Sequence, residues 1–239
     1  MPLLPNSLTR NITMSFKVLY VSATSSEADI LKEIVGIKSG TDSYKVGNIE
    51  ISLLVTGVGS VSTAWSINKW LSANEKPDLA INAGIAGSYN EELEIGDVVM
   101  PVSDCFADAG IEDGDNFLTL AESGLVSDNE FPFTEGNLVA DNRYTVQMKG
   151  LLKPVRAITV NTATGSDVTR EKLFKKYNPD IETMEGATFF YIFARENIPF
   201  LALRAISNRV EIRNKRNWNI ALALQNLSGT LNEVIKQLE

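Results

Sequence analysis

A regular alternation of short apolar runs with helix-like segments constrains this chain more than any other feature. Residues 17–23 (KVLYVSA) are typical of a buried strand, and after Ser25-Ser26-Glu27 apolar side chains recur at helical spacing. At the other end of the chain, a strand over 199–206 precedes a helix over 218–238 whose apolar residues follow the 3.6-residue period. Strands that alternate with helices predict an α/β fold, a central mixed sheet flanked by helices.

Similar patterns predict the remaining elements. Further strands are expected over 44–46, 49–56, 78–82, 97–102, 155–160 and 181–184, and further helices up to Ala73, near 169–177 and over 185–196. No repeat or linker divides the pattern, so we expect a single domain over 14–239. Residues 1–13 contain two prolines and no apolar run of signal-peptide length, and we expect them to be a disordered extension.

Two glycine-containing segments follow predicted strands. Gly57-Val58-Gly59 is either the start of a dinucleotide fingerprint or a tight turn, and Ser62 stands where the fingerprint needs its third glycine. The segment 83–87 (AGIAG) is expected to be a glycine-rich loop. It is either a simple turn or a place where a ligand approaches the backbone closely.

Residues 104–142 are expected to form a long irregular region with one short helix. Between Lys76 and Arg143 there are fifteen acidic residues and no basic one, whereas the chain from Arg143 onward holds fifteen basic and nine acidic residues. The acidic segment either lies over or beside a basic site or forms a solvated face.

Composition excludes several kinds of chemistry. The chain has no histidine, which removes Ser-His and Cys-His dyads and His-ligated zinc. Its single cysteine, Cys105, excludes an internal disulfide and indicates a reducing compartment, so we expect a cytoplasmic protein. A net charge of −8 argues against nucleic-acid binding, and no stretch reaches transmembrane length. A small-molecule partner fits best, and we expect neither a metal nor a cofactor.

Charged and polar residues at two predicted strand ends are candidates for chemistry. Glu182 and Glu185 lie where a strand gives way to a helix, a position that helix-dipole stabilisation alone would explain. Arg204 lies inside an apolar strand that ends on Ser207 and Asn208. A guanidinium is costly to bury without a carboxylate or ligand partner, which favours a functional interpretation.

Three ordered motifs resemble the superfamily of purine nucleoside phosphorylases and nucleosidases. They are INAGIAG at 81–87, TMEGA at 183–187 and RAISN at 204–208, and the resemblance extends over nearly the whole chain from residue 17. Three longer segments, at 106–118, 182–191 and 213–227, resemble the futalosine hydrolase family of menaquinone biosynthesis. The resemblance implies hydrolysis of the N-glycosidic bond of futalosine, with release of hypoxanthine and dehypoxanthine futalosine.

The resemblance also implies roles for individual residues. Glu27 matches the carboxylate that orients the attacking water, although a helix N-terminus alone would also explain it. Arg204 matches an arginine near that water, and Asn208 takes the place of an aspartate found in adenine-specific members. The implied substrate-binding residues are Ala86 and Gly87 at the ribose and purine, Met184 and Glu185 at the ribose, and Ser207 next to Asn208.

Two points depart from the family pattern. Ile85 stands where related nucleosidases have serine, so a hydroxyl near the water is missing. The residue that stacks on the purine cannot be aligned, and Phe106 is our candidate.

Other interpretations remain open at this level. A purine nucleoside phosphorylase, a methylthioadenosine/S-adenosylhomocysteine nucleosidase and a non-catalytic nucleoside-binding protein could share the fold. The family implies a homo-oligomer, for which Trp65 and Trp70 are possible interface residues. The aromatic run Phe189, Phe190, Tyr191 and Phe193 is interpreted as core.

Overall fold

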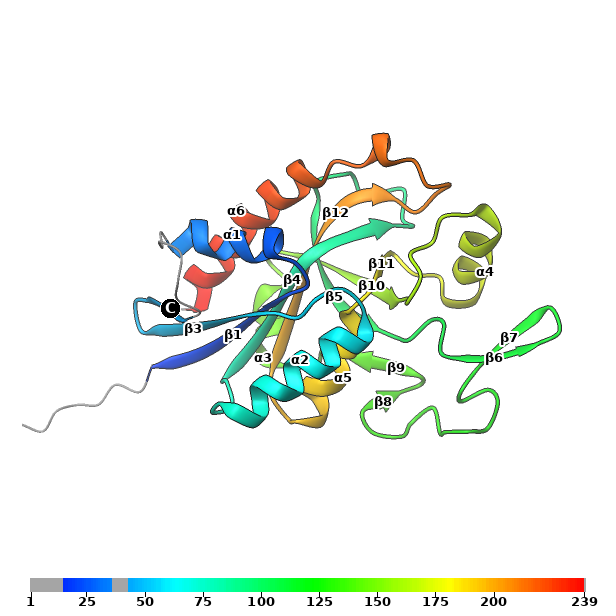
Figure 1. Cartoon of the computed structure of the whole chain (residues 1–239), viewed down its shortest axis with the longest axis horizontal. Coiled ribbons are helices and arrows are strands. Elements are labelled where there is room, and N and C mark those ends of the chain that lie inside the picture. The colour runs from blue at the N-terminus through cyan, green and yellow to red at the C-terminus, as the bar shows by residue number, and fades with distance from the viewer. Residues whose placement is uncertain (1–14, 36–42, 239) are drawn as a thin grey trace, which may run out of the picture.

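The computed structural model describes residues 15–35 and 43–238, and a mixed β-sheet with helices on both faces forms its centre (Figure 1). The expected extension over 1–13 lies outside the described residues. The strands are β1 Phe16–Ser22, β2 Ser43–Val46, β3 Ile49–Val55, β4 Leu79–Ser88, β5 Val98–Asp104, β6 Gly110–Asp113, β7 Asn116–Thr119, β8 Phe133–Thr134, β9 Asn137–Val139, β10 Lys153–Thr159, β11 Ile181–Thr183 and β12 Phe200–Arg209. The helices are α1 Ser25–Val35, α2 Ser60–Ala73, α3 Arg143–Met148, α4 Asp167–Tyr177, α5 Gly186–Arg195 and α6 Ile220–Leu238. The predicted α/β class is confirmed.

Strand β4 is the centre of the sheet. It pairs in parallel with β1 along its first half and with β12 along most of its length, and its last residues pair antiparallel with β11. Gly87 thereby has Asn208 of β12 as its register partner on one side and Glu182 of β11 on the other. The carboxyl ends of the parallel strands β1, β4 and β12 therefore lie toward the same edge of the sheet, where β11 joins from the opposite direction.

The segment 83–87 is a strand, so the expectation of a glycine-rich loop is wrong. Its residues continue β4 and pair with residues 203–208 of β12, which supplies the backbone hydrogen bonds that a loop would lack. The absence of a side chain at Gly84 lets the Glu27 carboxylate lie against the backbone of β4, because a Cβ on Gly84 would be only 2.5 Å from Oε1 of Glu27. Pairing with β12 along the whole segment, and also with β11 at Gly87, outweighs the low strand propensity of glycine and alanine.

The two faces of the sheet carry separate apolar cores. Helices α1 and α6 cover one face, and α2 and α5 cover the other (Figure 1). Phe189, Phe190 and Phe193 are fully buried in the second core, as the sequence predicts. Trp70 is half-buried and packs against this core, whereas Trp65 is 64% exposed.

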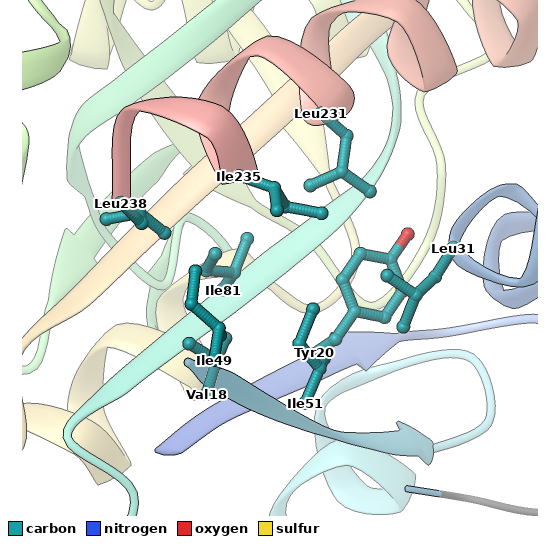
Figure 2. A pocket seen from close by; sticks show the side chains of 9 residues that line it. All are labelled: Val18, Tyr20, Leu31, Ile49, Ile51, Ile81, Leu231, Ile235 and Leu238. Atoms are coloured by element: carbon teal, nitrogen blue, oxygen red, sulfur yellow. The ribbon is translucent and has the colours of Figure 1, made fainter. Parts of the chain in front are cut away.

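Beneath α6 lies an entirely apolar contact, which we call the α6 contact (Figure 2). Leu231, Ile235 and Leu238 of α6 face side chains from β1, β3, β4 and α1, and the space between them has no room for a water molecule. Tyr20 of β1 places its ring in this contact, while its hydroxyl donates a hydrogen bond to the backbone oxygen of Glu27 at 2.9 Å. The α6 contact thus touches the segment that carries Glu27.

The acidic segment 104–142 differs from the expected irregular region. It forms the hairpin β6–β7, which extends away from the sheet, and the short strands β8 and β9 (Figure 1). The expected helix does not occur in this segment, all of which is described, and α3 begins only at Arg143. Lys176 of α4 pairs with Glu122 at 2.6 Å, so part of the acidic segment lies beside a basic helix. Among the described helices, none is long and apolar enough to cross a bilayer.

Candidate active site

A cavity of about 370 Å³ opens at the carboxyl ends of β4, β11 and β12. This size suits a small organic ligand, and strand ends are where open α/β sheets place their ligands. Seven of the predicted site residues line it: Glu27, Ala86, Gly87, Met184, Glu185, Ser207 and Asn208. Residues from segments far apart in the sequence therefore meet around one space.

Glu27 is held by three hydrogen bonds at the start of α1. Its Oε2 accepts from the backbone N and the hydroxyl of Thr24, at 2.9 and 2.8 Å. Together with a longer return bond from Glu27 N to the Thr24 hydroxyl, this is a capping box. Its Oε1 accepts from the backbone N of Ile85 at 3.1 Å. The helix cap therefore fixes a buried carboxylate at the cavity wall: the capping interpretation is confirmed, and the catalytic one stays a prediction.

Glu185 is the second carboxylate at this end of the cavity. Its Oε1 accepts a hydrogen bond from the backbone N of Gly59 at 2.8 Å. Gly57 and Gly59 both have positive φ angles, so the turn between β3 and α2 takes a shape that other residues rarely adopt. Burial raises the pKa of the Glu185 carboxyl, and the Gly59 N–H and the charge of Arg204 oppose that rise.

Arg204 lies beneath the cavity and does not line it. The guanidinium is 3% exposed and donates to the backbone oxygens of Asn82 and Leu203, at 3.0 and 2.9 Å, and to the Asn82 side chain. Burial lowers its pKa, while Glu185, Glu27 and Asp104 favour the charged form. Arg204 thus supplies a buried positive charge near the carboxylates.

Asp104, at the end of β5, connects to the start of α5. Its Oδ1 accepts from the hydroxyl of Thr159 at 3.0 Å, and that hydroxyl accepts from the backbone N of Ala187 at 2.7 Å. Its Oδ2 is buried and has no hydrogen-bond partner among the described residues. Burial raises the pKa of the Asp104 carboxyl to about 7. The next residue, Cys105, is 7% exposed, and burial raises the pKa of its thiol to about 12.

The other end of the cavity lies around Gly87. The side-chain nitrogen of Asn208 donates to the backbone oxygen of Arg209 at 2.8 Å, and its oxygen accepts from the hydroxyl of Ser207 at 2.8 Å. If Gly87 carried a Cβ, that atom would lie 3.1 Å from the side-chain nitrogen of Asn208. The Asn208 amide therefore lies directly over Gly87. This end presents an amide N–H group toward a patch of bare backbone.

Phe106 does not line the cavity. Its ring packs edge-on against Tyr191 at a centroid distance of 6.5 Å, against the core beside α5. The candidate for purine stacking is therefore not supported by its position. Among the described residues that line the cavity, the aromatic one is Trp218, just before α6.

The sequence patterns missed several polar residues around the cavity. Thr164 lies in the loop before α4, and its backbone N and hydroxyl donate to Glu182 at 2.8 and 2.5 Å. Tyr89 donates to the same carboxylate at 3.0 Å. The sequence pointed to this cluster only through Glu182, which belongs to the motif ETMEGA. Thr164 and Tyr89 lie in other segments, so no local pattern connects them with Glu182.

Charge in the cavity is of one sign. Glu27, Glu182 and Glu185 line it, and no lysine or arginine is among the described lining residues. An anionic reactant would meet three carboxylates there, whereas water would meet hydrogen-bond acceptors.

Comparison with known proteins connects this geometry with a family. The sequence model of the phosphorylase superfamily matches residues 17–236. A futalosine hydrolase from Acidothermus cellulolyticus is 32% identical over 90% of this chain and 88% of its own. A 5'-methylthioadenosine/S-adenosylhomocysteine nucleosidase from Staphylococcus aureus is 29% identical over 79% and 82%. The structure of a futalosine hydrolase from Helicobacter pylori shares the fold, with a TM-score of 0.78 at 18% identity over 93% of this chain and 98% of that one.

Proposed function

Because the chain belongs to the phosphorylase superfamily, we propose that it hydrolyses the N-glycosidic bond of futalosine and releases hypoxanthine and dehypoxanthine futalosine. At the level of the family it is a purine nucleosidase. The finer assignment is supported by relatives named futalosine hydrolases, one of which, from Streptomyces coelicolor, is 32% identical over 78% of this chain and 79% of its own.

The observation that carries the choice of hydrolysis is the charge of the cavity. Phosphorolysis requires a bound phosphate, and phosphate sites in proteins are built from arginine, lysine or several converging N–H groups. The described residues that line this cavity include three carboxylates and no basic side chain. Water is therefore the nucleophile that this site favours.

The proposed chemistry assigns one task to each carboxylate at the Glu27 end. Cleavage of an N-glycosidic bond passes through a cationic, oxocarbenium-like sugar, as glycoside hydrolysis does. Glu27, fixed by Thr24 and Ile85, orients the water and accepts its proton as the water attacks the anomeric carbon. Glu185 binds the ribose hydroxyls and stabilises the positive charge that develops on the sugar.

The departing base is stabilised at the Gly87 end. As the C–N bond breaks, its electron pair goes to the purine ring, and negative charge develops on the imidazole nitrogens. The Asn208 amide bonds to Ser207 and to the Arg209 backbone, and its remaining N–H donates to the base. This division places the nucleophile and the leaving group at opposite ends of one cavity.

The test is release of hypoxanthine from futalosine by the purified chain, measured with and without added phosphate. We expect release in buffer free of phosphate and no increase when phosphate is added. A rate that depends on phosphate would instead indicate a phosphorylase. Absence of release from every purine nucleoside would indicate a binding protein, and preference for methylthioadenosine would indicate the related nucleosidase activity.

A further inference from the structure

The residue at the N-cap of α5 does not cap that helix. Glu185 occupies this position, where a side chain ordinarily accepts a hydrogen bond from a free N–H of its own helix. Its carboxylate makes no such bond and accepts instead from the backbone N of Gly59 at 2.8 Å. The first turn of α5 contains no acidic residue either. The N–H groups at the start of this buried helix therefore need acceptors from other elements.

Two threonine hydroxyls from neighbouring strands supply these acceptors. The backbone N of Gly186 donates to the hydroxyl of Thr183, on β11, at 3.1 Å. The backbone N of Ala187 donates to the hydroxyl of Thr159, on β10, at 2.7 Å. The two hydroxyl oxygens lie 3.2 Å apart, and the Thr159 hydroxyl donates to Oδ1 of Asp104 at 3.0 Å. A chain of hydrogen bonds thus connects β5 with the start of α5.

The direction of these hydrogen bonds follows from the number of protons available. The Thr159 hydroxyl has one proton, which it donates to Asp104. In the bond between the two hydroxyls, Thr183 is therefore the donor. Asp104 is the acceptor that orients both hydroxyls, so that each presents a lone pair to the helix.

Asp104 also lies directly against the backbone of α5. It is 1% exposed, and a Cβ at Gly186 would overlap with its Oδ2. The backbone of Thr159 is held separately, because its N donates to the oxygen of Cys105 at 2.8 Å and its oxygen accepts from the N of Ala107 at 2.9 Å. A substitution at Thr159 therefore tests its side chain and leaves these backbone bonds in place.

We propose that Thr159, oriented by Asp104, is a positioning residue: its hydroxyl caps α5 in place of Glu185 and leaves the Glu185 carboxylate free to reach the cavity. This inference rests on the proposed function, in which Glu185 binds the ribose. Without the hydroxyl, a buried N–H would lose its acceptor, and Glu185 at the N-cap is placed to satisfy it. Buried phenylalanines anchor the rest of α5, so we expect its first turn to shift while the helix stays folded.

The first experiment requires no turnover. Hydrogen exchange of the ligand-free chain, followed by NMR, reports on the Gly59 N–H, which donates to Glu185. Thr159→Val removes the hydroxyl and keeps the branched shape, and we expect exchange at Gly59 to become about 10-fold faster or more. Thr159→Ser keeps the hydroxyl and should exchange as the wild type does. Unchanged exchange at Gly59 in Thr159→Val would overturn the proposal.

Thr188→Val is the matched control. Thr188 also lies in α5 and is 5% exposed, but its hydroxyl has no hydrogen-bond partner among the described residues. The same substitution there leaves the cap intact, so exchange at Gly59 and kcat should stay at wild-type values. Faster exchange at Gly59 in this control would attribute the effect to the packing of α5 and contradict the proposal.

Asp104→Ala tests the acceptor at the other end of the chain of hydrogen bonds. We expect it to accelerate exchange at Gly59 as Thr159→Val does, and the double variant to exchange no more than about 2-fold faster than either single variant. Wild-type exchange in Asp104→Ala would contradict the role of Asp104. If this variant does not melt cooperatively, Asp104→Leu, which is closer to the carboxyl in shape, replaces it.

The second experiment is a double-mutant cycle of Thr159→Val with Glu185→Gln, with futalosine as the substrate. Alone, Thr159→Val should lower kcat about 10-fold or more and change KM less than about 3-fold, because a displaced carboxylate matters most where charge develops on the sugar. In the Glu185→Gln background, which lacks this carboxylate, it should lower kcat less than about 3-fold. Additive effects would show that Thr159 does not act through Glu185.

The two proposals fail in different ways. If the wild-type chain does not cleave futalosine, the proposed function is wrong, and amide exchange at Gly59 still decides whether Thr159 positions Glu185. If the chain cleaves futalosine but exchange at Gly59 is unchanged and the cycle is additive, only the positioning role is wrong.

Discussion

The α6 contact and the cavity are built on the same strands but depend on different physical effects. Strand β4 contributes Ile81 to the apolar contact and, a few residues later, Ile85, Ala86 and Gly87 to the cavity. In the α6 contact any side chain of suitable shape and volume serves, because dispersion and burial are non-directional. In the cavity, hydrogen bonds fix Glu27 and Glu182 through both carboxylate oxygens and Glu185 through Oε1, so individual atoms matter.

The comparison predicts that the two regions respond differently to substitution. Changes in the cavity should alter rates and specificity with little effect on stability, and changes in the α6 contact should do the reverse. Tyr20 belongs to both regions, since its ring lies in the α6 contact and its hydroxyl bonds the backbone of Glu27. The following predictions test this separation.

Glu27→Gln should give the largest effect, a loss of kcat of about 10²-fold or more. Glutamine keeps the size of the side chain and, through its oxygen, the capping bonds to Thr24, but its amide nitrogen can accept neither the bond from Ile85 N nor the proton of the attacking water. Steady-state kinetics and thermal melting of the same samples check this, with hypoxanthine titration to verify that binding persists. A near-normal kcat would show that Glu27 does not activate the water.

Leu231→Ala should destabilise the fold by about 2–5 kcal/mol, because it removes a fully buried side chain from the α6 contact. We expect kcat and KM to stay near wild-type values at temperatures where the variant is folded. Urea unfolding and kinetics below the transition measure the two effects separately. A large loss of kcat in the folded variant would show that the α6 contact also controls the rate and would contradict the proposed separation of the two regions.

Asn208→Asp should erode or reverse the preference for 6-oxopurines. An amide nitrogen donates to the acceptors of hypoxanthine, whereas a carboxyl group that is protonated on one oxygen suits the donor and acceptor of adenine. The wild type should prefer futalosine over aminofutalosine and methylthioadenosine by about 10²-fold or more in kcat/KM. Comparable wild-type values for the three substrates would show that Asn208 does not recognise the base.

Asp104→Asn tests a carboxyl group that is as buried as the apolar core residues but accepts a hydrogen bond from Thr159. Burial raises the pKa of Asp104 from its ordinary value of 3.8 to about 7. The folded state therefore holds a proton that the unfolded chain releases, so the free energy of unfolding falls as pH rises from about 4 to about 7. Asparagine cannot ionise, so the free energy of unfolding of the variant should fall less steeply with pH than that of the wild type. The difference between the two slopes should be up to about 1 kcal/mol per pH unit. Urea midpoints across this range should converge for the two proteins at the acidic end, and parallel curves would contradict the prediction.

The smallest effect is expected at the outer limit of the cavity. Arg213, Lys215 and Arg216 are exposed just before Trp218, which lines the cavity, and one of them is predicted to pair with the distal carboxylate of futalosine. Arg209 is less suited, because it already donates to the backbone oxygens of Asn90 and Glu91. Alanine at the pairing residue should raise KM several-fold for futalosine and not for inosine. Equal changes for both substrates would exclude the pairing.

The sequence predicts the alternation of strands and helices because periodicity is a local property. It fails at 83–87, where glycine and alanine argue for a loop and only pairing with β12 and β11 makes a strand. Among the candidate residues, Glu27 was found through family resemblance, and its capping bonds then explain how it is held. Glu182 was a candidate carboxylate but was given no role, because Thr164 and Tyr89 reach it from segments that share no local pattern with it.

The buried thiol of Cys105, next to Asp104, can be used to measure local opening of the sheet at the end of β5. Cys105 is the only cysteine in the sequence, and its burial and raised pKa withhold the reactive thiolate from solvent in the folded state. A thiol-reactive dye will therefore label a molecule only when the end of β5 separates from its neighbours. The labelling rate in native buffer measures how often this edge of the sheet opens, and a ligand bound in the cavity should slow it.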